Sequence, residues 1–108
     1  MSDIEIIEAG LEKIKNCKAT SKRAVFEVYL KDCAHCQTQL ATLRRMKSRN
    51  SGVEFYKINA KFNPGVVNRY DIASVPTIIY VSEEGKTKTH TGVMNKKLLE
   101  RFIEDNPQ

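Results

Sequence analysis

The stretch VFEVYLKDCAHC, residues 25–36, determines how the rest of the sequence is interpreted. Its first six residues are β-branched, aromatic or aliphatic at every position except Glu27, which is typical of a buried strand in a parallel sheet. Asp32 is a good N-cap, so we expect a helix to open at Cys33. The pair Cys33 and Cys36 therefore lies where a buried strand passes into a helix.

Patterns on either side of this stretch predict further strands. Apolar runs predict a short edge strand at residues 4–6 and buried strands at residues 53–58 and 77–81. Alternation at residues 86–91, after a turn at Glu84-Gly85, predicts a strand that pairs with the preceding one.

Apolar residues at helical spacing predict the helices between these strands. A short helical segment is expected from Asn63 to Tyr70, and Asn95 is expected to cap a final helix. The predicted inner faces comprise Ile7, Leu11, Ile14 and Cys17; Cys36, Leu40 and Leu43; and Leu98, Leu99, Phe102 and Ile103. The order β-α-β-α-β-α-β-β-α predicts an α/β fold, with a central mixed β-sheet flanked by helices on both faces.

The chain has the size and composition of one soluble globular domain covering residues 1–108, with 41% hydrophobic and 29% charged residues. No apolar run approaches the roughly 20 residues that a membrane helix needs, so we expect no membrane association. Residues 1–5 are acidic and lack the basic start and apolar stretch of a signal peptide. This start predicts a cytoplasmic protein.

The net charge of +5 allows an acidic partner without requiring one. Part of the excess lies in a run formed by Arg44, Arg45, Lys47 and Arg49. We interpret this run as the solvated end of a helix, where cations suit the helix dipole. A nucleic-acid surface is the alternative, but no aromatic residues interleave with the run, which disfavours a nucleic-acid partner.

Three cysteines are too few for a disulfide framework, and C-x-x-C without a signal peptide indicates redox or metal chemistry. A zinc site would need two ligands besides this pair, and the remaining candidates are irregularly spaced: Cys17, His35 and His90. We therefore expect no metal. Cys17 lies on the apolar face of its helix, which predicts a buried free cysteine, with a regulatory thiol as the alternative.

A set of motifs together resembles the thioredoxin family over nearly the whole chain. They are C-A-H-C at residues 33–36, Lys57-Ile58-Asn59, Asn63-Pro64-Gly65, Tyr70-Asp71-Ile72, Val75-Pro76-Thr77, Gly85 and Gly92. A lone C-x-x-C is a weak signal, whereas the same motif at a strand-to-helix junction, with an apolar-Pro-Thr about forty residues later, is strong. The resemblance implies the thioredoxin fold and a thiol-disulfide oxidoreductase that exchanges dithiol and disulfide with protein substrates.

The resemblance also implies how such a protein works with its partners. Its electrons would come from a reductase or a low-molecular-weight thiol. It would need no cofactor beyond a redox-active Cys33–Cys36 disulfide, and it would act as a monomer.

The family pattern assigns roles to four residues around this disulfide. Cys33 would be the attacking thiolate, stabilised at a helix N-terminus, and Cys36 would be the resolving thiol. Glu27 occupies the position of a buried acid, usually Asp, that helps to move the proton of the resolving cysteine. Lys57 occupies the position of its partner lysine. The alternative for Glu27 is an edge-strand acid that faces water, and the alternative for Lys57 is a lysine that snorkels to the surface.

Pro76 matches the cis-proline that faces the active-site disulfide in this family. Val75 would offer its backbone to a substrate strand, and Gly92 is expected to contribute to the same binding surface. The alternative is an ordinary trans-proline at the start of a strand.

The chain departs from the family pattern around the disulfide. Asp32 stands in place of a tryptophan, and Ala34-His35 replaces Gly-Pro between the cysteines. Ser74 replaces a glycine, and Ala41 replaces a helix-kinking proline. These differences put recognition by a standard thioredoxin reductase in doubt.

His35 indicates a less reducing couple than that of thioredoxin. A histidine at this position resembles the strongly oxidising branch of the superfamily, where it stabilises the thiolate and hence the reduced form. Asp32 would oppose this effect, and an exposed bystander is the alternative for His35.

Two other functions remain as alternatives. A glutaredoxin-like hydrogen donor would take electrons from glutathione, but complete thioredoxin-type strands at both ends of the chain disfavour it. A non-catalytic thioredoxin-fold module could serve as a scaffold for a larger enzyme, an alternative that the basic surface keeps open.

Overall fold

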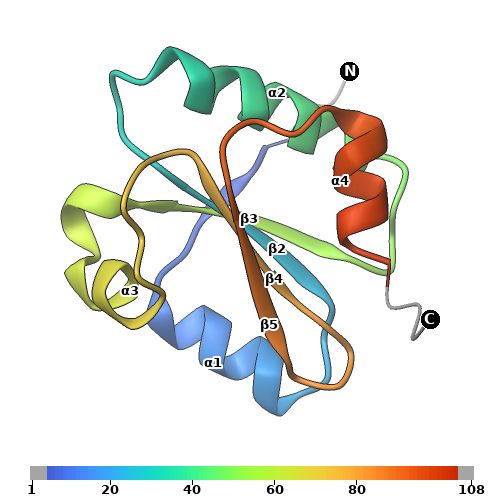
Figure 1. The fold of residues 1–108 in the computed structure, drawn as a ribbon. Helices are drawn as coiled ribbons and strands as arrows, with labels where there is room; N and C mark the ends of the chain where they lie inside the picture. The colour runs from blue at the N-terminus through green and yellow to red at the C-terminus, as the bar shows by residue number, and fades with distance from the viewer. Residues whose placement is uncertain (1–4, 105–108) are drawn as a thin grey trace.

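The computed structural model describes residues 5–104, and its elements follow the predicted order (Figure 1). The strands are β1 (Ile7–Glu8), β2 (Ala24–Tyr29), β3 (Glu54–Asn59), β4 (Thr77–Val81) and β5 (Thr87–Thr91). The helices are α1 (Leu11–Ala19), α2 (Ala34–Lys47), the 3-10 helix η1 (Ala60–Phe62), α3 (Pro64–Arg69) and α4 (Lys96–Phe102). None of the described helices has the length and apolar character needed to cross a membrane.

The five strands form one mixed sheet in the order β1-β3-β2-β4-β5. β1, β3 and β2 run parallel, whereas β4 is antiparallel to both of its neighbours. β2 is therefore the central strand, and its Glu27 is paired with Lys57 of β3 and with Ile78 of β4. The mixed sheet and the antiparallel hairpin confirm the predicted arrangement.

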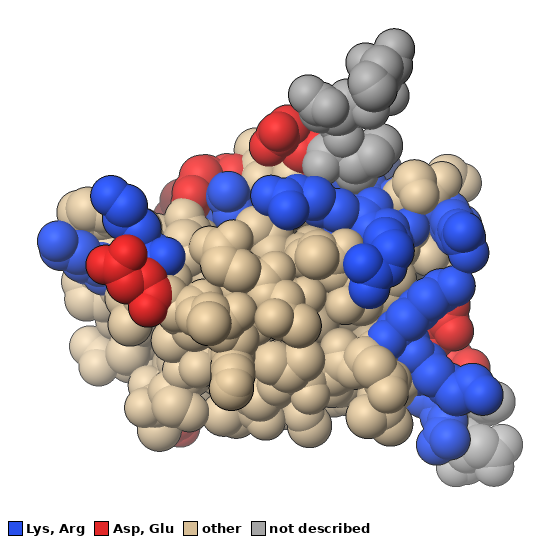
Figure 2. Space-filling model, turned by 90° about the horizontal axis from the view of Figure 1, so that it is seen from above, with Lys and Arg blue, Asp and Glu red and all other residues tan. Residues whose placement is uncertain are grey.

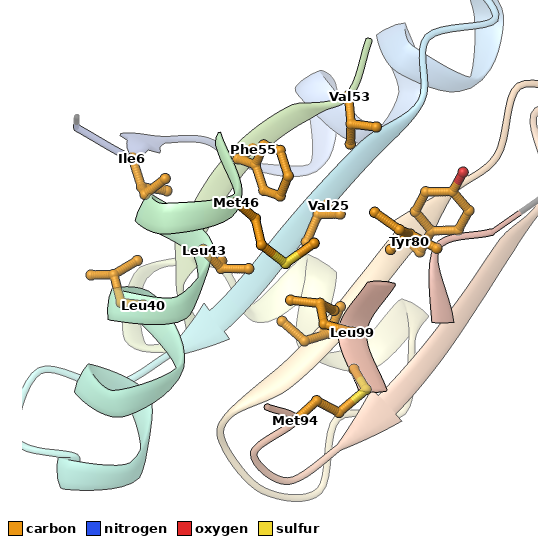
Figure 3. Packing of buried hydrophobic residues seen from close by; sticks show 12 residues of the cluster. Ile6, Val25, Leu40, Leu43, Met46, Val53, Phe55, Tyr80, Met94 and Leu99 are labelled. Carbon is orange, nitrogen blue, oxygen red and sulfur yellow. The ribbon is translucent and has the colours of Figure 1, made fainter. Parts of the chain in front are cut away.

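Helices cover both faces of the sheet (Figure 1), and a cluster of buried apolar side chains lies on each face. The face covered by α2 and α4, termed the α2 face, buries Ile6, Val25, Leu40, Leu43, Met46, Val53, Phe55, Ile78, Tyr80, Met94, Leu99 and Ile103 (Figure 3). The face covered by α1 and α3, termed the α1 face, buries Ile14, Cys17, Ala24, Phe26, Val28, Ile58, Val66, Ile79 and Val81. Successive residues of a strand point to opposite faces, so Glu27, two residues after Val25, points toward α2.

The predicted N-terminal strand is displaced along the chain. The edge strand lies at Ile7–Glu8 rather than at residues 4–6, and Ile4 lies outside the described residues. Ile6 is instead buried on the α2 face. Ile7 pairs with Tyr56 of β3 and is 58% exposed, so its predicted place on the inner face of the first helix is wrong.

Two other apolar residues are more exposed than predicted. Leu30 follows the end of β2 and is 41% exposed. Leu98 is 48% exposed, because α4 turns Leu99 toward the sheet and the preceding residue lies roughly 100° away around the helix. The predicted cap of this helix is confirmed, since the side chain of Asn95 accepts a hydrogen bond from the N–H of Leu98.

A buried glutamine joins α2 to the loop that precedes α4. The side chain of Gln39 is fully buried, and its amide donates to the carbonyl of Met94 at 3.0 Å. Its oxygen accepts from the N–H of the same residue at 2.7 Å. This loop has no strand partner at Met94, so one side chain satisfies both backbone groups of a buried residue.

We expect Gln39→Leu to destabilise the protein because it leaves the N–H and C=O of Met94 buried without partners. Each such group costs about 1–3 kcal/mol, so the free energy of unfolding should fall by about 2–6 kcal/mol in denaturant titrations. Gln37→Leu, at an exposed position of the same helix, is the matched control and should change it by less than about 0.5 kcal/mol. Equal stability of the two variants would show that other contacts hold the loop.

Candidate active site

Cys33 and Cys36 form a disulfide at the N-terminus of α2, with their Cα atoms 5.2 Å apart. Cys33 is itself the N-cap, with extended backbone angles, and its sulfur accepts a hydrogen bond from the N–H of Cys36 at 3.1 Å. The helix begins at Ala34, so the predicted N-cap role of Asp32 is wrong by one residue. Since an N-cap side chain faces the unpaired N–H groups of the first turn, the position suits a thiolate on Cys33.

The two sulfurs differ in exposure. Cys36 is 1% exposed and points into the protein, on the same side of α2 as Leu40 and Leu43. Cys33 is only partly buried, at the point where the chain leaves the strand layer. A thiolate on Cys33 is therefore reachable by another molecule, whereas Cys36 is reachable only from Cys33.

Sheet pairing brings two further segments to this end of the sheet. Val28, near the end of β2, pairs with Thr77 of β4, and Thr77 pairs with Thr91 of β5. The Val75-Pro76 peptide bond is cis, and the N–H of Gly92 donates to the carbonyl of Pro76 at 2.8 Å. Gly92 has a φ of +103°, a backbone conformation that residues with a side chain rarely adopt.

Glu27 is fully buried, and neither of its carboxyl oxygens has a hydrogen-bond partner among the described residues. Its position in the central strand excludes the alternative of an edge-strand acid facing water. Burial away from water raises the pKa of Glu27 to about 8, although Lys57 and Arg44 oppose that shift. The Glu27 side chain points from β2 toward α2, and Cys36 lies on the inner side of α2, so both are buried between these two elements.

Lys57 lies opposite Glu27 in the sheet, but its ammonium is engaged elsewhere. Its Nζ lies 4.0 Å from a carboxylate oxygen of Glu8 and 5.6 Å from the ring centre of Tyr29. The Lys57 side chain is 22% exposed, so its head reaches the surface at the edge of the sheet. Lys57 is therefore a neighbour of Glu27 in the backbone register, while its ammonium contacts Glu8 and Tyr29.

His35 and Asp32 are exposed on either side of Cys33. His35 is the second residue of α2, within the first turn, where its side chain borders the N-terminus of the helix. Asp32 precedes the N-cap. Their exposure places both within reach of a docking molecule.

A cavity of about 540 Å³ adjoins Cys33 and was not anticipated from the sequence. Its other lining residues are Leu30, Lys31, Asp32, Asn59, Lys61 and Phe62. Phe62 is 70% exposed, which is unusual for a large aromatic residue. In the sequence, the only sign of this cavity is that Phe62 is an aromatic residue in a polar segment. Local sequence patterns do not show that this segment adjoins the cysteines.

The basic run lies at the end of α2, as predicted, with Arg44, Arg45 and Lys47 in the last turn. Lys47 donates to the carbonyl of Glu5 at 2.5 Å, and Arg45 donates to the Thr42 hydroxyl at 3.2 Å. Figure 2 shows Lys and Arg along the margins of the face that carries α2, with an uncharged centre.

Cys17 is a buried free cysteine, as predicted. Its sulfur lies 3.9 Å from a carboxylate oxygen of Glu54, and burial together with this acid raises the pKa of the thiol. No group of three or more potential metal ligands occurs within residues 5–104.

Comparison with known proteins identifies the family. The thioredoxin family model matches residues 11–105. A thioredoxin of Borreliella burgdorferi is 25% identical over 96 residues, which cover 84% of this chain and 82% of that protein. A chloroplastic thioredoxin of Arabidopsis thaliana is 41% identical over 51 residues, 47% of this chain and 26% of that protein.

A solved structure supports the same assignment at the level of the fold. The oxidised form of mitochondrial thioredoxin 3 from Saccharomyces cerevisiae has a TM-score of 0.81 and 20% identity, covering 94% of this chain and 95% of that chain. With the family match over most of the sequence and a C-x-x-C disulfide on this fold, the chain belongs to the thioredoxin family and is a thiol-disulfide oxidoreductase, with the disulfide as its redox centre and no need of a cofactor.

Proposed function

We propose that the protein reduces or forms disulfides in protein substrates through a mixed disulfide on Cys33. In the reducing direction, the Cys33 thiolate attacks one substrate sulfur, and the other substrate sulfur leaves as a thiolate. Cys36 then loses its proton and attacks the Cys33 sulfur. The second substrate thiolate leaves, two electrons have passed to the substrate, and the Cys33–Cys36 disulfide remains. The partly exposed Cys33 at the N-cap beside a buried Cys36 is the observation that carries this assignment.

The surroundings of Cys33 favour an extended protein segment as the substrate. The cavity beside Cys33 offers the apolar side chains of Leu30 and Phe62, and on the other side the backbone of Val75 lies near Gly92. A segment that passes between them would place its disulfide over Cys33.

The electron donor of the protein is proposed to be a reductase or a low-molecular-weight thiol. Its compartment is proposed to be the cytoplasm, where free thiols such as that of Cys17 persist.

Glu27 is proposed to accept the proton of Cys36 during the second step. Both groups are buried between β2 and α2, where bulk water has little access. A carboxyl with a pKa near 8 is partly ionised at neutral pH, which allows it to take up and return a proton in the working range. Lys57 is proposed to assist by stabilising the ionised form.

The two alternatives differ in what they require of Cys33. A glutaredoxin-like donor would exchange with glutathione, but the relatives described above are thioredoxins. A non-catalytic scaffold would need no reactive thiol. Insulin reduction with dithiothreitol separates the enzyme from the scaffold: the native protein should accelerate it and Cys33→Ser should not.

We expect Cys36→Ser to accumulate covalent adducts with proteins, because attack needs only Cys33 whereas release needs Cys36. Pull-down from a lysate, followed by elution with a reductant, measures the adducts. Cys33→Ser is the control and should capture none. Equal capture by both variants would show that the assigned roles of the cysteines are wrong.

We expect Glu27→Gln to slow turnover at neutral pH by at least about tenfold, since a buried amide cannot accept the Cys36 proton. The native rate should rise with pH as Glu27 ionises near pH 8, and the variant should lack that rise. Measurement of insulin reduction from pH 6 to 9 tests both points. An unchanged pH profile would exclude Glu27 as the proton acceptor.

We expect His35→Pro to make the couple more reducing. A donating imidazole beside the helix N-terminus favours the Cys33 thiolate and hence the reduced form, so its loss should destabilise that form. A rise of one to two units in the Cys33 pKa corresponds to a potential lower by roughly 30–60 mV, an upper limit because Asp32 opposes His35.

Thiolate absorbance and equilibration with glutathione buffers measure the two quantities for His35→Pro. Proline is tolerated in the first turn of a helix, so the fold should persist. A potential that stays constant or rises would identify His35 as a bystander.

A further inference from the structure

The contacts of Lys57 are not those of a lysine paired with the buried acid. Lys57 lies between two acids on the same face of the sheet, because it is paired with Glu8 of β1 on one side and with Glu27 of β2 on the other. Its Nζ lies 4.0 Å from Glu8, and the oxygens of Glu27 accept no hydrogen bond from any residue between 5 and 104. The ammonium is thus held beside Glu8 rather than hydrogen-bonded to Glu27.

Tyr29 completes this arrangement from the end of β2. Its hydroxyl donates to the same Glu8 oxygen that lies near Lys57, and its ring lies under the ammonium at 5.6 Å. Only Val28 separates it from Glu27 along the strand, so the two side chains share a face. The ring and the Glu8 carboxylate together offer the lysine a cation site at the sheet edge.

We propose that Glu8 and Tyr29 are positioning residues, which hold the Lys57 ammonium at the edge of the sheet and thereby keep the Glu27 carboxyl protonated in the oxidised protein. The inference rests on the proton-acceptor role proposed above for Glu27. It explains why the Glu27 carboxyl is protonated: Lys57, which could stabilise the ionised form, is bound by Glu8 instead.

The other groups that face Glu27 have less influence than Lys57 on whether its carboxyl is ionised. Arg44 approaches from α2 and favours the ionised form of Glu27, but burial outweighs it. Cys36 on α2 is in the disulfide, and the β4 residue beside Glu27 is the apolar Ile78. Lys57 is therefore the cation whose position can change the charge state of Glu27 most directly, because an ammonium within about 4–6 Å of a carboxyl lowers its pKa by roughly 1–3 units.

Glu8→Gln tests the proposal without disturbing the core, since the Glu8 side chain is 56% exposed. Loss of the carboxylate frees the Lys57 ammonium to approach Glu27, so the pKa of Glu27 in the oxidised protein should fall by about one unit or more. Tyr29→Phe, which keeps the ring and removes the hydroxyl, should shift it in the same direction by less. Carbon-13 NMR titration of the Glu27 carboxyl measures each value directly.

A double-mutant cycle shows whether Glu8 acts through Lys57. Lys57→Met should raise the pKa of Glu27, and adding Glu8→Gln to that variant should cause no further change. Glu12→Gln is the matched control, because Glu12 is an exposed acid that pairs with Lys15 at 3.9 Å on α1, and it should leave the titration unchanged.

The outcomes separate this inference from the proposed function. A Glu27 pKa that stays constant or rises in Glu8→Gln, or that falls equally with and without Lys57, would overturn the positioning role. If the pKa falls as expected but the turnover of Glu8→Gln keeps its native pH profile, the positioning role stands and the proton-acceptor role of Glu27 fails.

Discussion

The chemistry depends on where the central strand ends. β2 lies between β3 and β4 and is covered by helices on both faces, so its direction is fixed by hydrogen bonds on two sides and by packing above and below. Only the three residues from Leu30 to Asp32 separate it from Cys33 at the N-cap of α2. The helix in turn is held to the sheet by Leu40, Leu43 and Met46. The sulfur of Cys33 is thus placed by the central strand and by a helix packed on it, and such fixed placement is what thiolate stabilisation by a helix terminus requires.

The same burial that fixes β2 makes Glu27 costly to ionise. Its pKa in the folded protein is about 8, above the ordinary value of 4.5, so the native state binds more protons than the unfolded state between these values. The stability that goes with the protonated carboxyl is fully present below pH 4.5 and is lost as the pH rises through 8. A hydrophobic residue at this position would avoid that loss. Stability therefore does not explain the carboxyl, whereas the proton transfer proposed for Glu27 would.

The sequence predicts the interior of the sheet better than the edges of the sheet. Strand β4 agrees at both ends with the predicted residues 77–81, because a continuous apolar run between turn residues leaves one interpretation. The two-residue strand β1 was misplaced, since its position depends on pairing with Tyr56 and Lys57 about fifty residues away. Asp32 and Cys33 are both able to cap a helix, and only the path of the chain out of β2 decides between them. The contact of Lys57 with Glu8 and the link from Gln39 to Met94 are likewise absent from local patterns, because each joins distant segments.

Exposure divides the residues around the disulfide into two groups. Cys36 and Glu27, to which proton and disulfide chemistry is assigned, are buried, and their surroundings are set by the core. Two of the departures from the family pattern, Asp32 and His35, are exposed, and Asp32 lines the cavity that Phe62 helps to form. Buried positions are constrained by packing, whereas an exposed side chain changes at little cost in stability. The exposed residues can therefore alter which partner docks, and how strongly the couple reduces, without changing the buried surroundings in which we propose that the proton moves.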